Sequence, residues 1–242
     1  MAATAGTFDI GRPFVYVFED KDWITKVLIG GAVLFGSILF CVALVGLVGL
    51  MLITGYQRRV ALNVADGSDV PLPELFAQPG EDIMNGLKMM AIGFVWILPA
   101  ILLRLVGVVL MLVITAASGG NNDDAAAAGG MLMIGTSCLA IPLQIAGSIF
   151  AFLGVIRFWD TGELGAGFRV GELIALAKRQ WVNCLLAFVV MIGAGIAAEM
   201  VGFMLLCVGI FFTMFWSNLA SAHAIGQIIK IDRTARGSAL VA

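Results

Sequence analysis

Long apolar runs without charged residues constrain the fold of this chain more than any other feature. They occupy residues 27–57, 89–103, 105–113, 131–156, 181–198 and 200–229. About 20 helical residues cross the ~30 Å hydrocarbon core of a bilayer, so each long run is a candidate membrane span. The pattern predicts an all-α, polytopic integral membrane bundle in which residues 1–242 form a single transmembrane domain.

The composition agrees with a lipid environment. Hydrophobic residues make up 61% of the chain, charged residues 12%, and the mean hydropathy is +1.03, whereas roughly a quarter of the residues of a soluble domain are charged. The 14 Lys and Arg residues nearly balance the 16 Asp and Glu residues. We therefore expect the lipid bilayer as a partner and expect no nucleic acid, which binds strongly basic surfaces.

The basic residues predict the orientation of the spans. Those that flank the apolar runs are Lys21, Lys26, Arg58, Arg59, Arg157, Arg169, Lys178, Arg179, Lys230, Arg233 and Arg236. Residues 118–130, by contrast, contain no Lys or Arg. Because cytoplasmic loops carry an excess of Lys and Arg, we expect both termini in the cytoplasm and residues 118–130 as an external loop.

This orientation requires an even number of crossings in the first apolar run and in the last two. We predict six spans, at about residues 24–40, 42–60, 87–116, 131–156, 181–198 and 200–228. Residues 40–43 contain no turn residue. A four-span arrangement in which the first helix is long and tilted therefore stays open.

Three segments outside the apolar runs are expected to lie at the cytoplasmic interface as short amphipathic helices. They are residues 8–22, 72–86 and 164–179, which mix apolar with charged residues. Such helices lie in the plane of the interface. A subsidiary hypothesis is that the second and third segments sense or bend the bilayer.

The sequence GYQRR at residues 55–59 predicts a membrane boundary. Tyr56 is an amphipathic aromatic residue of the kind enriched there, and Arg58 and Arg59 are expected to anchor the helix end in the cytoplasm or on lipid phosphates. Two prolines shortly afterwards prevent the helix from continuing. A turn with anchors accounts for these residues without a ligand site.

Further residues are candidates for helix contacts or interface anchors. Trp23 and Trp181 each stand at or just before the start of an apolar run. Gly30, Gly31 and Gly55 lie in apolar sequence and are expected on contact surfaces, because small residues let helices approach closely.

His223, the only histidine, lies in the sequence NLASAHAIGQ on a small, polar helix face. Such a face packs against another helix more often than it binds a pigment or haem. His223 is therefore a candidate interface residue.

The residue pattern does not indicate a metal, a cofactor or an enzyme. The four cysteines, Cys41, Cys138, Cys184 and Cys207, lie in apolar sequence without C-x-x-C spacing. Neither G-x-S-x-G nor H-E-x-x-H is present. We expect no catalytic, cofactor-binding or metal-binding residues.

Four stretches, FVYVFEDKDW, KVLIGG, GYQRRVALNVADG and LPELF, resemble an uncharacterised family of prokaryotic polytopic membrane proteins, a domain of unknown function. The shared pattern is Trp, Gly-Gly, Gly-Tyr and Leu-Pro-Glu in this order, over about residues 14–100. Members often have a proline in the first run, whereas this chain has none between Pro13 and Pro71. The resemblance implies a helical membrane domain and a prokaryotic source, but no activity or cofactor.

Arg104 and Glu199 are the two charges that interrupt long apolar runs. An ionisable residue at membrane depth is by default a functional hypothesis, because its burial costs at least ~2.5 kcal/mol. A pair between them would offset both burial costs. In the alternative interpretation, Arg104 reaches the outer headgroups and Glu199 lies at the outer turn between two spans.

These observations lead to two hypotheses of function. The first is a non-catalytic accessory, scaffold or assembly subunit of a larger complex in the inner membrane of a prokaryote, with other membrane subunits or copies of itself as partners. The alternative is a small transporter or channel that uses Arg104 and Glu199.

Overall fold

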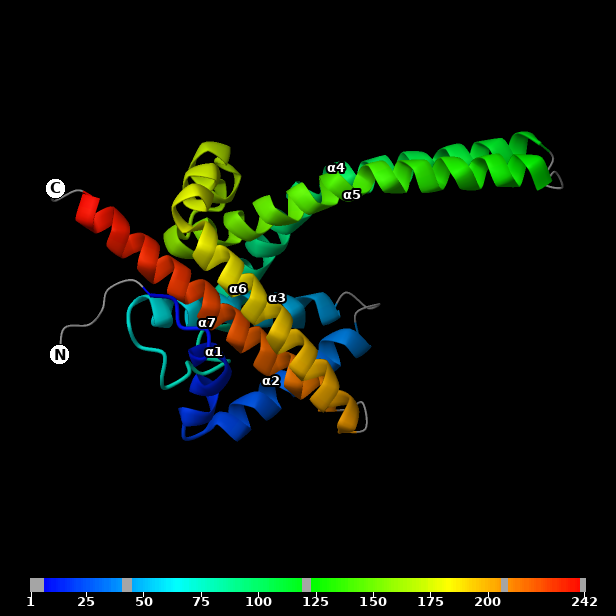
Figure 1. Ribbon diagram of the computed structural model, residues 1–242. Coiled ribbons are helices and arrows are strands. Elements are labelled where there is room, and N and C mark those ends of the chain that lie inside the picture. The colour runs from blue at the N-terminus through cyan, green and yellow to red at the C-terminus, as the bar shows by residue number, and fades with distance from the viewer. Residues whose placement is uncertain (1–6, 41–44, 119–122, 206–208, 240–242) are drawn as a thin grey trace.

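The computed structural model describes residues 7–40, 45–118, 123–205 and 209–239, and within these residues every regular element is a helix (Figure 1). In chain order the elements are α1 (Arg12–Val15), the 3-10 helix η1 (Tyr16–Glu19), α2 (Trp23–Leu39), α3 (Val45–Ala65), α4 (Pro79–Ala117), α5 (Asp123–Thr161), the 3-10 helix η3 (Leu164–Phe168), α6 (Val170–Met204) and α7 (Gly209–Ala239). The predicted all-α class is confirmed.

Three helices, α4, α5 and α6, are long and apolar enough to cross a membrane. The segment Arg12–Glu19 and α2 qualify together as a fourth span, although the chain bends by 110° between them. Helices α3 and α7 coincide with two more predicted spans but do not qualify, and polar residues such as Arg59 and His223 lower their hydropathy. By length and composition, the described part of the chain contains three candidate spans, or four with the bent pair, so the predicted six are not confirmed. The turn predicted between the first two spans lies outside the described residues.

Helices α4 and α5 form a long antiparallel hairpin that extends away from the other helices (Figure 1). We call its outer part, residues 97–117 and 123–146, the arm, and the rest of the molecule the body. The predicted external loop is shorter than expected, because residues 123–130 already belong to α5. Four consecutive alanines, which favour helix, and two aspartates in the first turn, which suit the helix dipole, explain this early start.

Glycines allow the helices to approach closely. A Cβ atom at Gly107 of α4 would overlap the Thr136 side chain of α5, and a Cβ atom at Gly147 would overlap the backbone of Trp96. Where α3 crosses α4, a Cβ atom at Gly55 would overlap the backbone of Asp82. The hairpin and its junction with the body therefore depend on the absence of a side chain at these three positions.

The core of the body surrounds α7, which lies along α6 and contacts α2 and α3. Its largest fully buried side chains include Trp159, Tyr16, Tyr56, Phe158 and Phe215. Tyr16 and Val17, in the segment predicted to lie on the interface, are completely buried in this core. Of the two other predicted interfacial helices, residues 72–78 are not helical, and residues 170–179 form the part of α6 before a break at Gln180.

Candidate functional site

Polar side chains of the body gather where the N-terminal segment and the loop at residues 66–78 pack on α7. Asp69, in this loop, accepts a hydrogen bond from Nε of Arg12 at 2.6 Å, and Arg12 also pairs with Glu19 at 2.6 Å. The ring of His223 lies 3.4 Å from the same Asp69 oxygen. Burial raises the pKa of Asp69, but the hydrogen bond and charge of Arg12, helped by His223, bring this pKa below its usual value.

The hydrogen bonds around His223 define which ring nitrogen carries its proton. The Gln227 amide oxygen accepts a hydrogen bond from the backbone N–H of Asp9 at 2.7 Å, so its amide nitrogen faces the Asp9 carbonyl at 2.8 Å and Nδ1 of His223 at 3.2 Å. Because the amide nitrogen only donates, Nδ1 must accept. A neutral His223 therefore carries its proton on Nε2, and this N–H donates a hydrogen bond to Asp69.

His223 is 2% exposed, and the centre of its ring lies 4.4 Å from the centre of the Tyr16 ring. It is thus an internal contact residue that holds the N-terminal segment on α7. The described residues contain no group of three or more His, Cys, Asp or Glu side chains suited to a metal ion.

Arg59 binds inside the protein rather than on lipid. Its Nε and Nη2 atoms donate to the two oxygens of Asp82 at 2.8 Å and 2.5 Å, and Nη2 also reaches the carbonyl oxygens of Glu74 and Leu75. Asp82 is completely buried. The pair joins α3 to the first turn of α4 and closes the loop between them.

Tyr56 and Arg58 also depart from their predicted role as anchors in the headgroup region. Tyr56 is 1% exposed, and its hydroxyl donates to the Pro73 carbonyl at 2.8 Å. The Arg58 guanidinium lies 5.7 Å from the centre of the Phe158 ring. The physical reason for Tyr56 is that the loop at residues 66–78 folds back over the end of α3. Arg58 instead lies against the end of α5.

The other predicted contact residues have separate surroundings. Gly30 and Gly31 of α2 face Phe215 and Phe212 of α7, where an added Cβ atom would overlap the rings. Their contact surface therefore lies within the fold. Trp181 is 65% exposed, just after the break in α6, a position open to the lipid interface.

A second ionic cluster at the ends of α5, α6 and α7 was missed by sequence reasoning. Asp160 of α5 accepts from Arg233 at 2.6 Å and from Arg236 at 2.5 Å, both of α7. Asp232 of α7 pairs with Arg179 of α6 at 3.1 Å. The signal available in the sequence was the occurrence of acidic residues among the basic ones that end the apolar runs.

The two charges predicted within the membrane are not brought together. Arg104 lies on the exposed side of the arm, and its nearest partner is Gln144 of α5, whose side-chain oxygen is 3.5 Å away. Glu199, near the end of α6, is exposed. Among the described residues, no ion pair joins them, so the pair is not formed within one chain.

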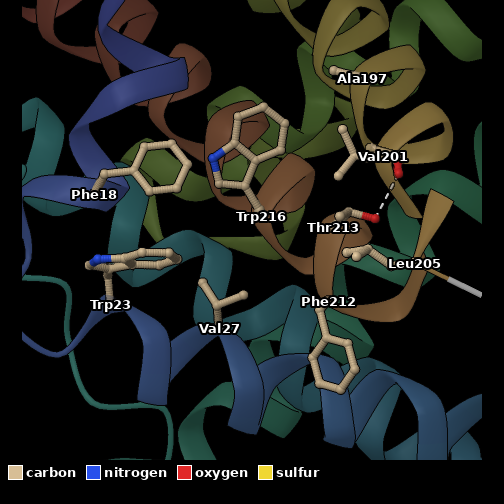
Figure 2. Close-up of a pocket in the computed structure, with 10 residues that line it drawn as sticks. Phe18, Trp23, Val27, Ala197, Val201, Leu205, Phe212, Thr213 and Trp216 are labelled. Carbon is tan, nitrogen blue, oxygen red and sulfur yellow. Dashed lines mark hydrogen bonds between the residues drawn. The ribbon is translucent and has the colours of Figure 1, made fainter. Parts of the chain in front are cut away.

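A cavity of about 370 Å³ opens between the bend before α2, the end of α6 and the start of α7 (Figure 2). Its lining residues are Phe18, Trp23, Val27, Ala197, Ala198, Val201, Leu205, Phe212, Thr213 and Trp216. The Thr213 hydroxyl donates to the Ala198 carbonyl at 2.7 Å and is thereby satisfied. The cavity is suited only to an apolar group, and Trp23, predicted as an anchor, forms part of its wall.

These features define a helical membrane protein whose polar groups mostly bind each other inside the body. The chain belongs to DUF4013, a family described as proteins of unknown function, whose model matches residues 35–207. The predicted membership of an uncharacterised family is thus confirmed. No curated protein and no solved structure matches the chain.

Proposed function

We propose that this protein is a non-catalytic scaffold or accessory subunit that organises other membrane subunits through helix contacts in the bilayer. We place it in the inner membrane of a prokaryote with both termini in the cytoplasm, because the basic residues concentrate on the loops of one side. The arm is the observation that carries this proposal.

The arm presents apolar side chains on most of its surface. Only 11% of the most apolar part of α4 is buried in the molecule. Leu105, Val109, Leu112 and Val113 are each about half exposed or more. A surface of this kind faces either lipid or the helices of another subunit, since lipid tails and apolar side chains are similar environments.

Arg104 favours a protein neighbour over lipid alone. It stands within the apolar part of α4, its side chain is exposed, and Gln144 supplies a single long contact. An arginine at the centre of a membrane helix costs about 2.5–3.5 kcal/mol on insertion scales. A neighbouring helix with a hydrogen-bond acceptor or carboxylate offsets this cost.

The proposal is tested by extraction from the native membrane in a mild detergent, with the particle mass and protein content measured together. We expect a particle that contains foreign subunits in fixed ratio to this chain. Gly135→Leu serves as the matched variant, because a Cβ atom at Gly135 meets no atom within 4 Å. It should preserve the fold but remove the foreign subunits that dock on this side of the arm.

A particle that contains only this chain would contradict the proposal. In that case the alternative of a transporter or channel gains weight, and flux through liposomes that contain the purified protein becomes the decisive measurement. The parent protein should then conduct, and Arg104→Gln should not.

A further inference from the structure

We propose that two copies of this chain associate in the membrane through an ion pair between Arg104 of one copy and Glu199 of the other. This contact goes beyond the proposed function, since it concerns the chain with itself rather than with foreign subunits. The proposal rests on two opposite, exposed charges that lie on two different apolar helices.

Among the residues that the structure describes, neither charge has an ionic partner. The guanidinium of Arg104 has the neutral Gln144 as its nearest partner, at 3.5 Å. The carboxylate of Glu199 makes no hydrogen bond or ion pair with any described residue. Elsewhere in the body, buried carboxylates such as Asp20, Asp82 and Asp160 are all paired with basic residues. Arg104 and Glu199 differ from these carboxylates, because they are exposed within apolar runs and have no ionic partner among the described residues.

The helices that carry the two charges cannot bring them together within one chain. Helix α4 packs on α5 and α3, whereas α6 packs on α7. In Figure 1 the arm and the last turns of α6 diverge from the region where the helices meet. A second copy supplies the missing charge to each of them.

Each charge lies a similar number of residues beyond an ion pair in the first part of its helix. Helix α4 is fastened there by Asp82, which binds Arg59, and α6 by Arg179, which binds Asp232. At ~1.5 Å per residue, Arg104 lies ~33 Å along α4 from Asp82, and Glu199 lies ~30 Å along α6 from Arg179. The two charges therefore lie at similar distances along their helices from these ion pairs.

Exposed apolar side chains surround both charges on their helices. One turn before and after Arg104 stand Ile101, 39% exposed, and Val108, 40% exposed. The corresponding neighbours of Glu199 are Ile196, 54% exposed, and Phe203, 72% exposed. Contact between these faces would exclude lipid around the ion pair, where a charge-assisted hydrogen bond is strong.

Charge reversal tests the proposal with purified protein, without any foreign subunit. Arg104→Glu places two carboxylates in opposition across the contact, and Glu199→Arg places two guanidiniums there. We expect each variant alone to lose the oligomer, as measured by the mass of the protein in mild detergent and by subunit counting in liposomes. A mixture of the two variants, produced together, should recover the parent oligomer, because each copy then meets an opposite charge on its neighbour.

The matched controls reverse charges on the same two helices outside the proposed contact. Lys88→Glu on α4 and Lys178→Glu on α6 lie in the first parts of these helices, several turns before Arg104 and Glu199. Both should retain the parent oligomer. The double variant Arg104→Glu with Glu199→Arg should retain it as well, since the pair is restored with its signs exchanged.

Cysteine pairing tests the contact without reversing any charge. In a chain whose four native cysteines are replaced by serine, Arg104→Cys and Glu199→Cys are placed on copies with different tags. We expect a disulfide-linked dimer that carries both tags, and none when either variant is present alone.

A monomeric parent protein in liposomes would overturn the proposal. So would single reversals that keep the oligomer, or a mixture that fails to recover it while the controls do. These outcomes leave the proposed scaffold function intact, because that function is tested by foreign subunits in the native particle.

Discussion

Arg58 and Arg59 show that residue type alone does not determine what a charged side chain binds. In sequence, both read as anchors at a membrane boundary. In the structure, Arg59 binds the fully buried Asp82 with two hydrogen bonds, and Arg58 lies against Phe158. Arginine suits such a pair, because its planar guanidinium matches a carboxylate at two points. The sequence shows the charge but not the partner, which lies on the next helix.

Asp69 provides a test at this scale. Asp69→Asn should lower the free energy of unfolding by roughly 1–2 kcal/mol at pH 7, because Arg12 and His223 lose a charged acceptor. Since the pKa of Asp69 is lowered in the folded protein, its contribution is present above the usual carboxyl value of ~3.9 and is lost as the pH falls through the lowered pKa. Thermal unfolding in detergent between pH 7 and pH 3 measures this, and the variant should lose less stability than the parent on acidification.

Asp66→Asn is the matched control for this measurement. Asp66 pairs with Arg233, but its side chain is 66% exposed, and exposed ion pairs contribute little. We expect its unfolding to follow the parent at each pH. If Asp69→Asn and the parent lose equal stability on acidification, the ion pair with Arg12 does not stabilise the fold.

At the scale of elements, the sequence predicts helices well and their contacts poorly. The apolar runs coincide with α2 to α7, because an uncharged run has one stable backbone conformation in a bilayer. The loop at residues 66–78 was not predicted to cover α3, since such packing depends on distant residues such as His223. The same holds for Tyr56, whose type suits both a membrane boundary and a core in which its hydroxyl finds a carbonyl.

The crossing of α3 and α4 gives a prediction for two glycines. Gly55→Ala should destabilise the protein by about 1–3 kcal/mol, because a Cβ atom there would overlap the backbone of Asp82 and overpacking has this typical effect. Gly93→Ala should stabilise it by about 0.5–1 kcal/mol, because its Cβ atom meets no atom within 4 Å and alanine favours helix. Unfolding in detergent measures both. Equal effects of the two substitutions would contradict the described crossing.

At the scale of the whole molecule, the sequence predicts a membrane protein and the sides of its loops, whereas the number of crossings depends on how helices tilt and bend. The bend of 110° before α2 is such a case. A sequence pattern gives the length of an apolar segment but not the direction in which its helix runs. The candidate charges illustrate the same limit, since their positions in apolar runs are readable from the sequence and their separation in the folded chain is not.

The orientation is tested with a membrane-impermeant thiol reagent on cells that produce single-cysteine variants. We expect Ser118→Cys to react from outside, and Ser68→Cys and Gly237→Cys to react only after the membrane is opened, because basic residues flank the latter two positions. Reaction of Ser68→Cys in intact cells would show that residues 7–67 cross the membrane an odd number of times, given a cytoplasmic N-terminus.

The arm is attached to the body at one end only, and glycine contacts join its two helices along their length. We therefore expect the arm to move as one unit about its junction with the body near Trp96. At ~1.5 Å per residue, residues 97–117 extend ~30 Å beyond this junction. A rotation of about 10° at the junction would move the end of the arm sideways by about 5 Å. A small rearrangement in the body would thereby displace the tip by about half a helix diameter.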